Sequence, residues 1–311
     1  MSKILVFGHQ SPDTDAITCA ITYSYLLNQL GYEAEAVALG EINKETEYAL
    51  KQFGYEAPRI IEQAGDETDT VALVDHNEFQ QSVSDIKDLK IHSVVDHHRV
   101  GNFETAEPTY VTIKPLGCCQ SVIYLLYKEH GVDIPADIAG LMLSGLISDS
   151  LLYSSPTFTE QDKEIAKDLV AHAGIDDQAY GTAMLKAGAN VDDKSEEDIA
   201  EGDAKSFTMG DFNVRIGQVN VVDVNDVLKR KEQMLSAMES LSAKKGYDGF
   251  LLIVTNILTN DSEGLFVGAD AMIPKVEEAF NVTVTDHQLP LKGVVSRKKQ
   301  VVPPMTTAFE K

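Results

Sequence analysis

Residues 4–20, ILVFGHQSPDTDAITCA, contain an apolar run, a polar loop and the beginning of a helical pattern. The apolar run Ile4–Phe7 predicts a buried β-strand, and the apolar residues after the loop recur at helical spacing. His9, Asp13 and Asp15 therefore lie in a loop at the carboxyl end of a strand, where open α/β sheets bind their ligands. An imidazole and two carboxylates crowded into one short loop predict a metal site.

The same pattern recurs twice along the chain. Apolar residues 71–74 end at Asp75, and the strand-like residues 91–95 run into Asp96-His97-His98. Because the carboxyl ends of parallel strands lie side by side, these groups are expected along one edge of a sheet. A further acid, Asp149, follows an apolar run with helical spacing. The candidate metal ligands are His9, Asp13, Asp15, Asp75, His97 and Asp149.

This nitrogen and oxygen donor set suits Mn²⁺, Mg²⁺, Fe²⁺ or Co²⁺ better than a structural zinc ion. Six ligands favour two ions with one bridging carboxylate, a pair that can hold a bridging hydroxide for in-line phosphoryl displacement. Adjacent residues of an extended strand point to opposite sides. We therefore expect one of His97 and His98 to bind metal and the other to face the substrate, and Asp96 to orient an imidazole.

The composition predicts a soluble globular protein, and the length predicts two domains. The chain has 311 residues, of which 43% are apolar and 24% charged. It shows no signal-peptide pattern and no membrane-spanning run, and its three cysteines lack metal-ligand spacing, so we expect reduced thiols and a cytoplasmic location. The net charge of −23 disfavours nucleic acid and anionic membranes as partners.

The order of patterns predicts the domain organisation. Residues 1–188 are expected to form an N-terminal metal-binding domain, with a parallel sheet flanked by helices. Polar residues 189–194 are expected to form a linker or hinge, and residues 195–311 a smaller C-terminal α/β domain that binds substrate. In that second part we expect a long helix near 223–245 and a strand over 292–302.

A basic stretch, Ser296-Arg297-Lys298-Lys299-Gln300, interrupts this acidic chain. It is either a solvated turn or strand edge, or a source of cations for an anionic substrate, since Arg binds phosphate through two hydrogen bonds and Lys acts as a point charge. Lys205, taken alone, is typical of a surface residue. No glycine-rich phosphate loop of the GxxxxGK[ST] or GxGxxG type is present.

Together, Gly8–Asp15, Asp75-His76-Asn77 and Asp96-His97-His98 resemble the Asp-His-His phosphoesterase superfamily. With the basic stretch, the chain is similar to the manganese-dependent family II inorganic pyrophosphatases. The resemblance implies a cytoplasmic enzyme, commonly a homodimer through its N-terminal domain, that hydrolyses pyrophosphate to two phosphates. It implies two Mn²⁺ (or Co²⁺) ions per chain, with additional Mg²⁺ accompanying the substrate.

The resemblance also implies roles for individual residues. One ion would be held by His9, Asp13 and Asp75, and the second by Asp15, Asp75, His97 and Asp149. Asp75 and His98 would be catalytic, and the substrate would be bound by His98, Lys205, Arg297 and Lys298. The substrate would draw the two domains together over the site.

Two other functions remain open. Superfamily relatives cleave phosphodiesters such as short oligonucleotides or cyclic dinucleotides, but those carry a glycine-rich element with a histidine where this chain has Ser296–Gln300, and this chain has no Trp to stack on bases. The other alternative is a metal-dependent anion-binding module without turnover. Nothing between Asp15 and Asp149 is large enough for a regulatory nucleotide-binding insertion, so an unregulated form is expected.

Overall fold

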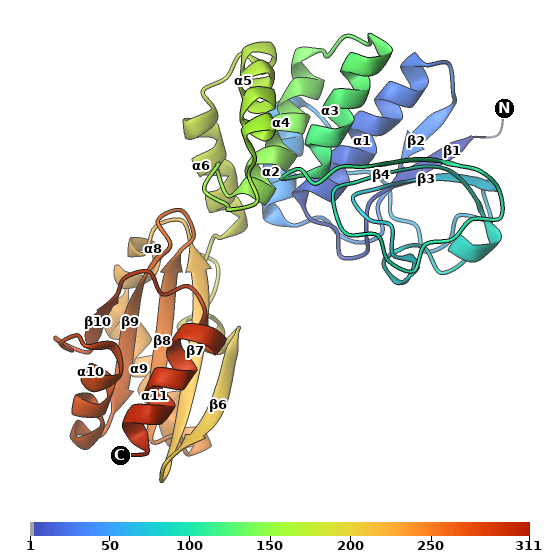
Figure 1. The fold of residues 1–311 in the computed structure, drawn as a ribbon. Coiled ribbons are helices and arrows are strands. Elements are labelled where there is room, and N and C mark those ends of the chain that lie inside the picture. The colour runs from blue at the N-terminus through green and yellow to red at the C-terminus, as the bar shows by residue number, and fades with distance from the viewer. Residues whose placement is uncertain (1–2) are drawn as a thin grey trace. The chain divides into compact units, whose positions relative to one another are not determined.

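The computed structural model describes residues 3–311 and forms two compact units, the first ending at Gly188 and the second running from Ala189 to Lys311 (Figure 1). The α/β class expected from the sequence is confirmed in both units. Within residues 3–311, no helix is long and apolar enough to cross a membrane.

The first unit is built on a five-stranded sheet in which every strand pair is parallel. The strand order is β2 (Ala34–Ala36), β1 (Ile4–Phe7), β3 (Thr70–Val74), β4 (Lys90–Asp96) and β5 (Tyr110–Ile113). Its helices are α1 (Thr14–Gln29), α2 (Lys44–Phe53), α3 (Cys119–His130), α4 (Ala136–Ser150), α5 (Glu160–Ala173) and α6 (Asp177–Gly188). Because β1, β3 and β4 are neighbours, the loops after them share one edge of the sheet.

The two faces of this sheet are covered differently. Helices α1 and α3 pack against one face (Figure 1). On the other face, Phe7 and Leu73 pack with Val83 and Ile86, which lie in the irregular segment between β3 and β4. Strands β1 and β3 are therefore buried on both sides, as their continuous apolar runs predicted.

The second unit has a mixed five-stranded sheet of order β10 (Gln288–Leu291), β9 (Asp261–Gly268), β8 (Gly249–Asn256), β7 (Phe212–Val221) and β6 (Ala204–Met209). Only β7 and β8 pair in parallel. Its helices are α7 (Glu196–Glu201), α8 (Asn225–Leu228), α9 (Lys231–Lys245), α10 (Ile273–Phe280) and α11 (Val302–Phe309). Helix α9 covers one face, and α10 and α11 cover the other.

Two expectations for the second unit are wrong. The single helix over 223–245 is broken into α8 and α9. The strand over 292–302 is absent, because β10 ends at Leu291, Gly293 turns the chain with φ +69°, and a π-helical turn, Arg297–Val301, leads into α11. Val301 and Met305, one helical turn apart, are both fully buried in the core, which explains why this segment is helical.

Candidate metal centre

The six candidate ligands lie in the first unit, where the fold brings them to one site. Asp13 is the N-cap of α1, and its carboxylate accepts a hydrogen bond of 2.9 Å from the Ala16 N–H. Asp15 lies in the first turn of the same helix. Asp75 directly follows β3, His97 follows β4, and Asp149 is in the last turn of α4.

These side chains form overlapping groups around Asp75. The Nε2 atom of His9 is 3.6 Å from Asp75 Oδ2, and that of His97 is 3.3 Å from Asp75 Oδ1. In three groups, one donor atom from each residue lies within 4.8 Å of the others: His9, Asp13 and Asp75; Asp15, His97 and Asp149; and Asp75, His97 and His98. Asp75, whose backbone is left-handed at φ +57°, belongs to the first group and contacts the second through His97.

The chemistry of these donors fits divalent cations. Among residues 3–311, Asp75 Oδ1 and His97 Nε2 are buried and have no hydrogen-bond partner of good geometry, which is costly for polar atoms. Burial, and then the charges of Asp15 and Asp13, raises the pKa of Asp75 well above its ordinary value. Burial, and then the charges of Asp15 and Asp75, does the same to the pKa of Asp149. Bound cations would neutralise the charge of these carboxylates and would coordinate the atoms that lack a hydrogen-bond partner.

Outer contacts orient the ligands toward the centre. His97 Nδ1 donates to the Leu116 carbonyl at 3.1 Å, which leaves its Nε2 for the site. Asp15 accepts a hydrogen bond of 2.7 Å from the Cys119 N–H at the start of α3. For His9, burial lowers the pKa, but hydrogen bonds with the Asp13 carboxylate and the Gln10 carbonyl raise it to about 9.

The side chains of His97 and His98 do not point to opposite sides, so the expectation from strand alternation is wrong. Strand β4 ends at Asp96, the two histidines lie in a bend, and their ring centroids are 4.1 Å apart. Both imidazoles lie close to Asp75, with His98 Nδ1 at 3.8 Å from Oδ1. Asp96 orients His98 by accepting a hydrogen bond of 2.9 Å from Nδ1, and Asn77 donates to Asp96 at 2.6 Å.

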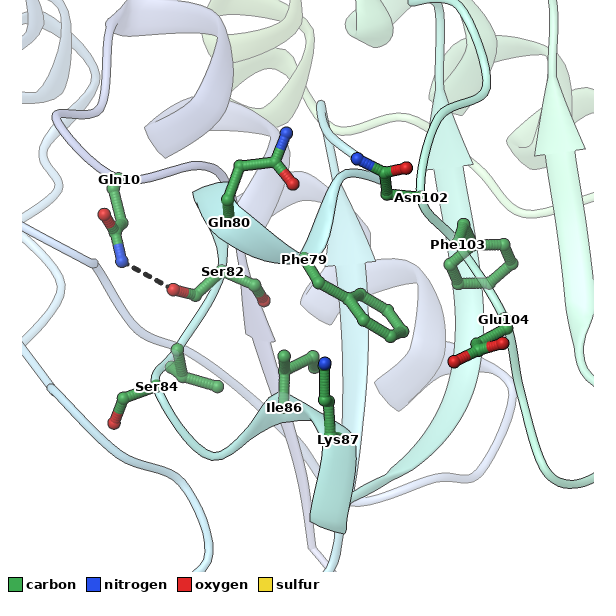
Figure 2. A pocket seen from close by; sticks show the side chains of 11 residues that line it. Gln10, Phe79, Gln80, Ser82, Ser84, Ile86, Lys87, Asn102, Phe103 and Glu104 are labelled. Carbon is green, nitrogen blue, oxygen red and sulfur yellow. Dashed lines mark hydrogen bonds between the residues drawn. The ribbon is translucent and has the colours of Figure 1, made fainter.

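The metal-centre cavity has a volume of about 350 Å³. Its lining includes Asn77, for which the sequence suggested no role, and three residues that sequence analysis did not single out: Glu78, Gln81 and Arg99. Asn77, Glu78 and Arg99 lie in irregular segments after β3 and β4, and Gln81 ends the short 3₁₀ helix Phe79–Gln81, so no periodicity identifies them. A neighbouring groove of about 790 Å³ is lined by Phe79 and Phe103, and Gln10 donates from Nε2 to the Ser82 carbonyl at 2.7 Å on its wall (Figure 2).

The candidate phosphate-binding cations belong to the second unit. Arg297 lies in the π-helical turn, and its guanidinium donates to Asp203, with Nη2 2.8 Å from Oδ1. Lys205 is exposed on β6, two residues beyond Asp203, and Lys298 is exposed beside Arg297. The fold of the second unit thus brings Arg297 to the start of the strand that carries Lys205.

The architecture and the site together define a two-domain protein of the DHH class. Its parallel sheet carries acids and imidazoles at three strand ends, and its second sheet is mixed. The DHH family, N-terminal domain, matches residues 3–146, and the DHHA2 domain matches residues 182–308.

Full-length relatives define the family more closely. A Lactobacillus johnsonii protein named "Probable manganese-dependent inorganic pyrophosphatase" is 57% identical over 310 residues, which cover 100% of both chains. A Bacillus licheniformis protein of the same name is 54% identical with the same coverage. The crystal structure of a Methanococcus jannaschii protein assigned to family II inorganic pyrophosphatase is 39% identical with a TM-score of 0.61, covering 99% of this chain and 100% of that one. The chain belongs to the manganese-dependent inorganic pyrophosphatase family.

Proposed function

We propose that the protein hydrolyses inorganic pyrophosphate to two phosphates with two divalent ions bound at the strand edge. The observation that carries this is the position of Asp75, whose two carboxylate oxygens face different histidines. The names of the full-length relatives support the reaction and the use of manganese.

The donor groups suggest how the ions are held. His9, Asp13 and Asp75 would hold one ion, and Asp15, His97 and Asp149 would hold the second. Asp75, whose Oδ1 is 3.3 Å from His97 Nε2, would serve both ions. When bound, two Mn²⁺ or Co²⁺ ions would supply Lewis-acid stabilisation of the transferred phosphoryl group and an acidified water. Additional Mg²⁺ would accompany the substrate polyanion.

His98 is suited to donate a proton to the leaving phosphate. Its side chain is 53% exposed at the rim of the centre, whereas that of Asp75 is 2% exposed. Asp96 accepts a hydrogen bond from Nδ1, which fixes the orientation of the ring and leaves Nε2 to face a substrate oxygen. A hydrogen-bonded pair of this kind is the usual way to orient a catalytic imidazole.

Lys205, Arg297 and Lys298 are proposed to bind the substrate phosphates. The first unit supplies mainly carboxylates and imidazoles to the centre, so a polyanionic substrate needs positive charge from elsewhere in the chain. Arg297 presents a planar fork of donors, now engaged with Asp203, that also matches a phosphate oxygen pair.

An outermost strand of the first sheet, β5, supports the proposed homodimer. Strand β5 pairs with β4 on one side only, and Tyr110 and Val111 on it are 75% and 47% exposed. Such an edge presents unpaired backbone N–H and C=O groups that a second copy can cover. Sedimentation should show a dimer, and Val111→Lys should shift it toward the monomer.

A substrate panel tests the proposed reaction. The Mn²⁺-loaded protein should release phosphate from pyrophosphate and leave a cyclic dinucleotide and a short oligonucleotide intact. Preferential cleavage of either diester would assign the chain to phosphodiester chemistry instead. Tight metal binding without turnover of any of the three would indicate an anion-binding module.

A further inference from the structure

Glu45, on α2, contacts two segments that carry candidate ligands. Its Oε1 atom accepts a hydrogen bond of 2.8 Å from the Thr14 hydroxyl and one of 2.5 Å from the Ser148 hydroxyl. Thr14 lies between Asp13 and Asp15, and Ser148 directly precedes Asp149. One carboxylate oxygen thus connects the start of α1 with the end of α4.

We infer that Glu45 is a positioning residue of the metal centre, which holds the segment of Asp13 and Asp15 at a fixed spacing from Asp149. Hydroxyl-to-carboxylate hydrogen bonds are short and stronger than those between neutral groups, so two of them on one oxygen resist separation of the segments. Thr14 is fully buried and also lies 3.1 Å from the Thr46 hydroxyl on α2, which adds a second link to the same helix.

The spacing matters because the second donor group combines both segments. Asp15 comes from α1 and Asp149 from α4, and their donor atoms lie within 4.8 Å of one another together with His97. Separation of the two helices would therefore open this group. The group of His9, Asp13 and Asp75 contains no residue of α4 and should be affected less.

The exit of the chain from the first unit packs on the same side chain. Gly188, the last residue of α6, lies so close that a Cβ there would be 2.8 Å from Glu45 Cβ and 3.0 Å from its Oε2. A methyl group at position 188 would displace Glu45 without removing its carboxylate. Gly188→Ala is therefore an independent way to disturb the spacing.

The test uses the full-length protein with Glu45→Ala, Glu45→Gln and the control Glu47→Ala, whose residue is exposed on the same helix and pairs with Lys44 at 3.7 Å. Mn²⁺ affinity is measured by equilibrium dialysis, the ligand field by the Co²⁺ absorption spectrum, and folding by thermal melting. Glu45→Ala should weaken the binding of one ion by about 10–100-fold and alter the Co²⁺ spectrum, as expected for an outer-contact residue.

Glu45→Gln keeps an acceptor oxygen and should restore most of that affinity, and Glu47→Ala should match the parent. Glu45→Ala that binds both ions as tightly as the parent, with an unchanged Co²⁺ spectrum, would overturn the inference. Should Glu45→Ala fail to fold, the Gly188→Ala variant decides. Weaker binding of one of the two ions supports the positioning role of Glu45, and normal binding of both ions refutes it.

This inference rests on the proposed two-ion centre, and the measurements separate their failures. A parent protein that binds two ions but does not hydrolyse pyrophosphate refutes the proposed reaction, while the titrations still decide the role of Glu45. A parent that binds no divalent ion overturns both.

Discussion

Gly145→Ala should damage the metal centre while leaving the fold intact. Gly145 lies inside α4 against Asp15, and a Cβ built on it would be 2.3 Å from Asp15 Oδ1 and 2.8 Å from Gln120 Cγ. Ordinary contacts begin at 3.4 Å, so the Asp15 carboxylate would have to retreat by about 1 Å. Asp15 is also held at 2.7 Å by the Cys119 N–H, which a shift of that size would break.

The expected magnitudes separate stability from metal binding. Alanine favours a helix interior over glycine by about 1 kcal/mol, whereas overpacking costs about 1–3 kcal/mol, so the net loss of stability is about 0–2 kcal/mol. A net loss of that size lowers the melting temperature by only a few degrees in a protein this large. A displacement of about 1 Å in a catalytic group can cost about 10²-fold, and we expect that loss in turnover, with weakened Mn²⁺ binding.

Gly140→Ala provides a matched control on the same helix. Its Cβ would meet the Phe53 ring at 2.1 Å, a comparable clash that involves no candidate ligand. Equilibrium dialysis with Mn²⁺, phosphate release and thermal melting should be measured for both variants. Equal losses of metal in the two would show a general effect of overpacking, and undiminished binding of two ions by Gly145→Ala would refute the placement of Asp15.

Other consequences can be measured separately. Asp75→Asn should lose both ions, because each proposed ion uses it, and metal analysis that still finds two would contradict the bridge. His98→Gln should keep both ions but lose about 10²–10⁴-fold in turnover; full activity would exclude it as proton donor. Arg297→Ala and Lys298→Ala should raise KM with unchanged metal content, and an unchanged KM would remove them from the substrate site. Because the pKa of Asp75 is raised, protons compete with Mn²⁺ at low pH. The affinity for Mn²⁺ should therefore keep rising with pH above the range in which an ordinary aspartate loses its proton, and a flat profile would count against this acid as a ligand.

The strand ends could be predicted from sequence because two independent patterns coincide there. The apolar runs of β1, β3 and β4 identify buried parallel strands, and each stops at acids or imidazoles. The parallel arrangement then requires these residues to share an edge. No tertiary information is needed for that step, so His9 and Asp75 could be placed near one another before the structure was known.

Features that depend on tertiary packing were beyond prediction. Val294, Val295, Val301 and Val302 favour a strand by intrinsic preference, but burial of Val301 and Met305 against the second sheet makes the segment helical. Glu45 resembles any acid in the first turn of a helix until the distant hydroxyls of Thr14 and Ser148 are found on its oxygen.

The left-handed backbone of Asp75 restricts which acid can occupy that position. Side chains other than glycine enter this region at a cost of roughly 1–2 kcal/mol, and aspartate and asparagine, with short polar side chains, tolerate it best. The substitution Asp75→Glu would keep the same charge, but glutamate tolerates the left-handed backbone conformation poorly. The longer side chain would also need space at a position where only 2% of Asp75 is exposed. The backbone therefore selects aspartate over glutamate by shape alone, before any cation contributes.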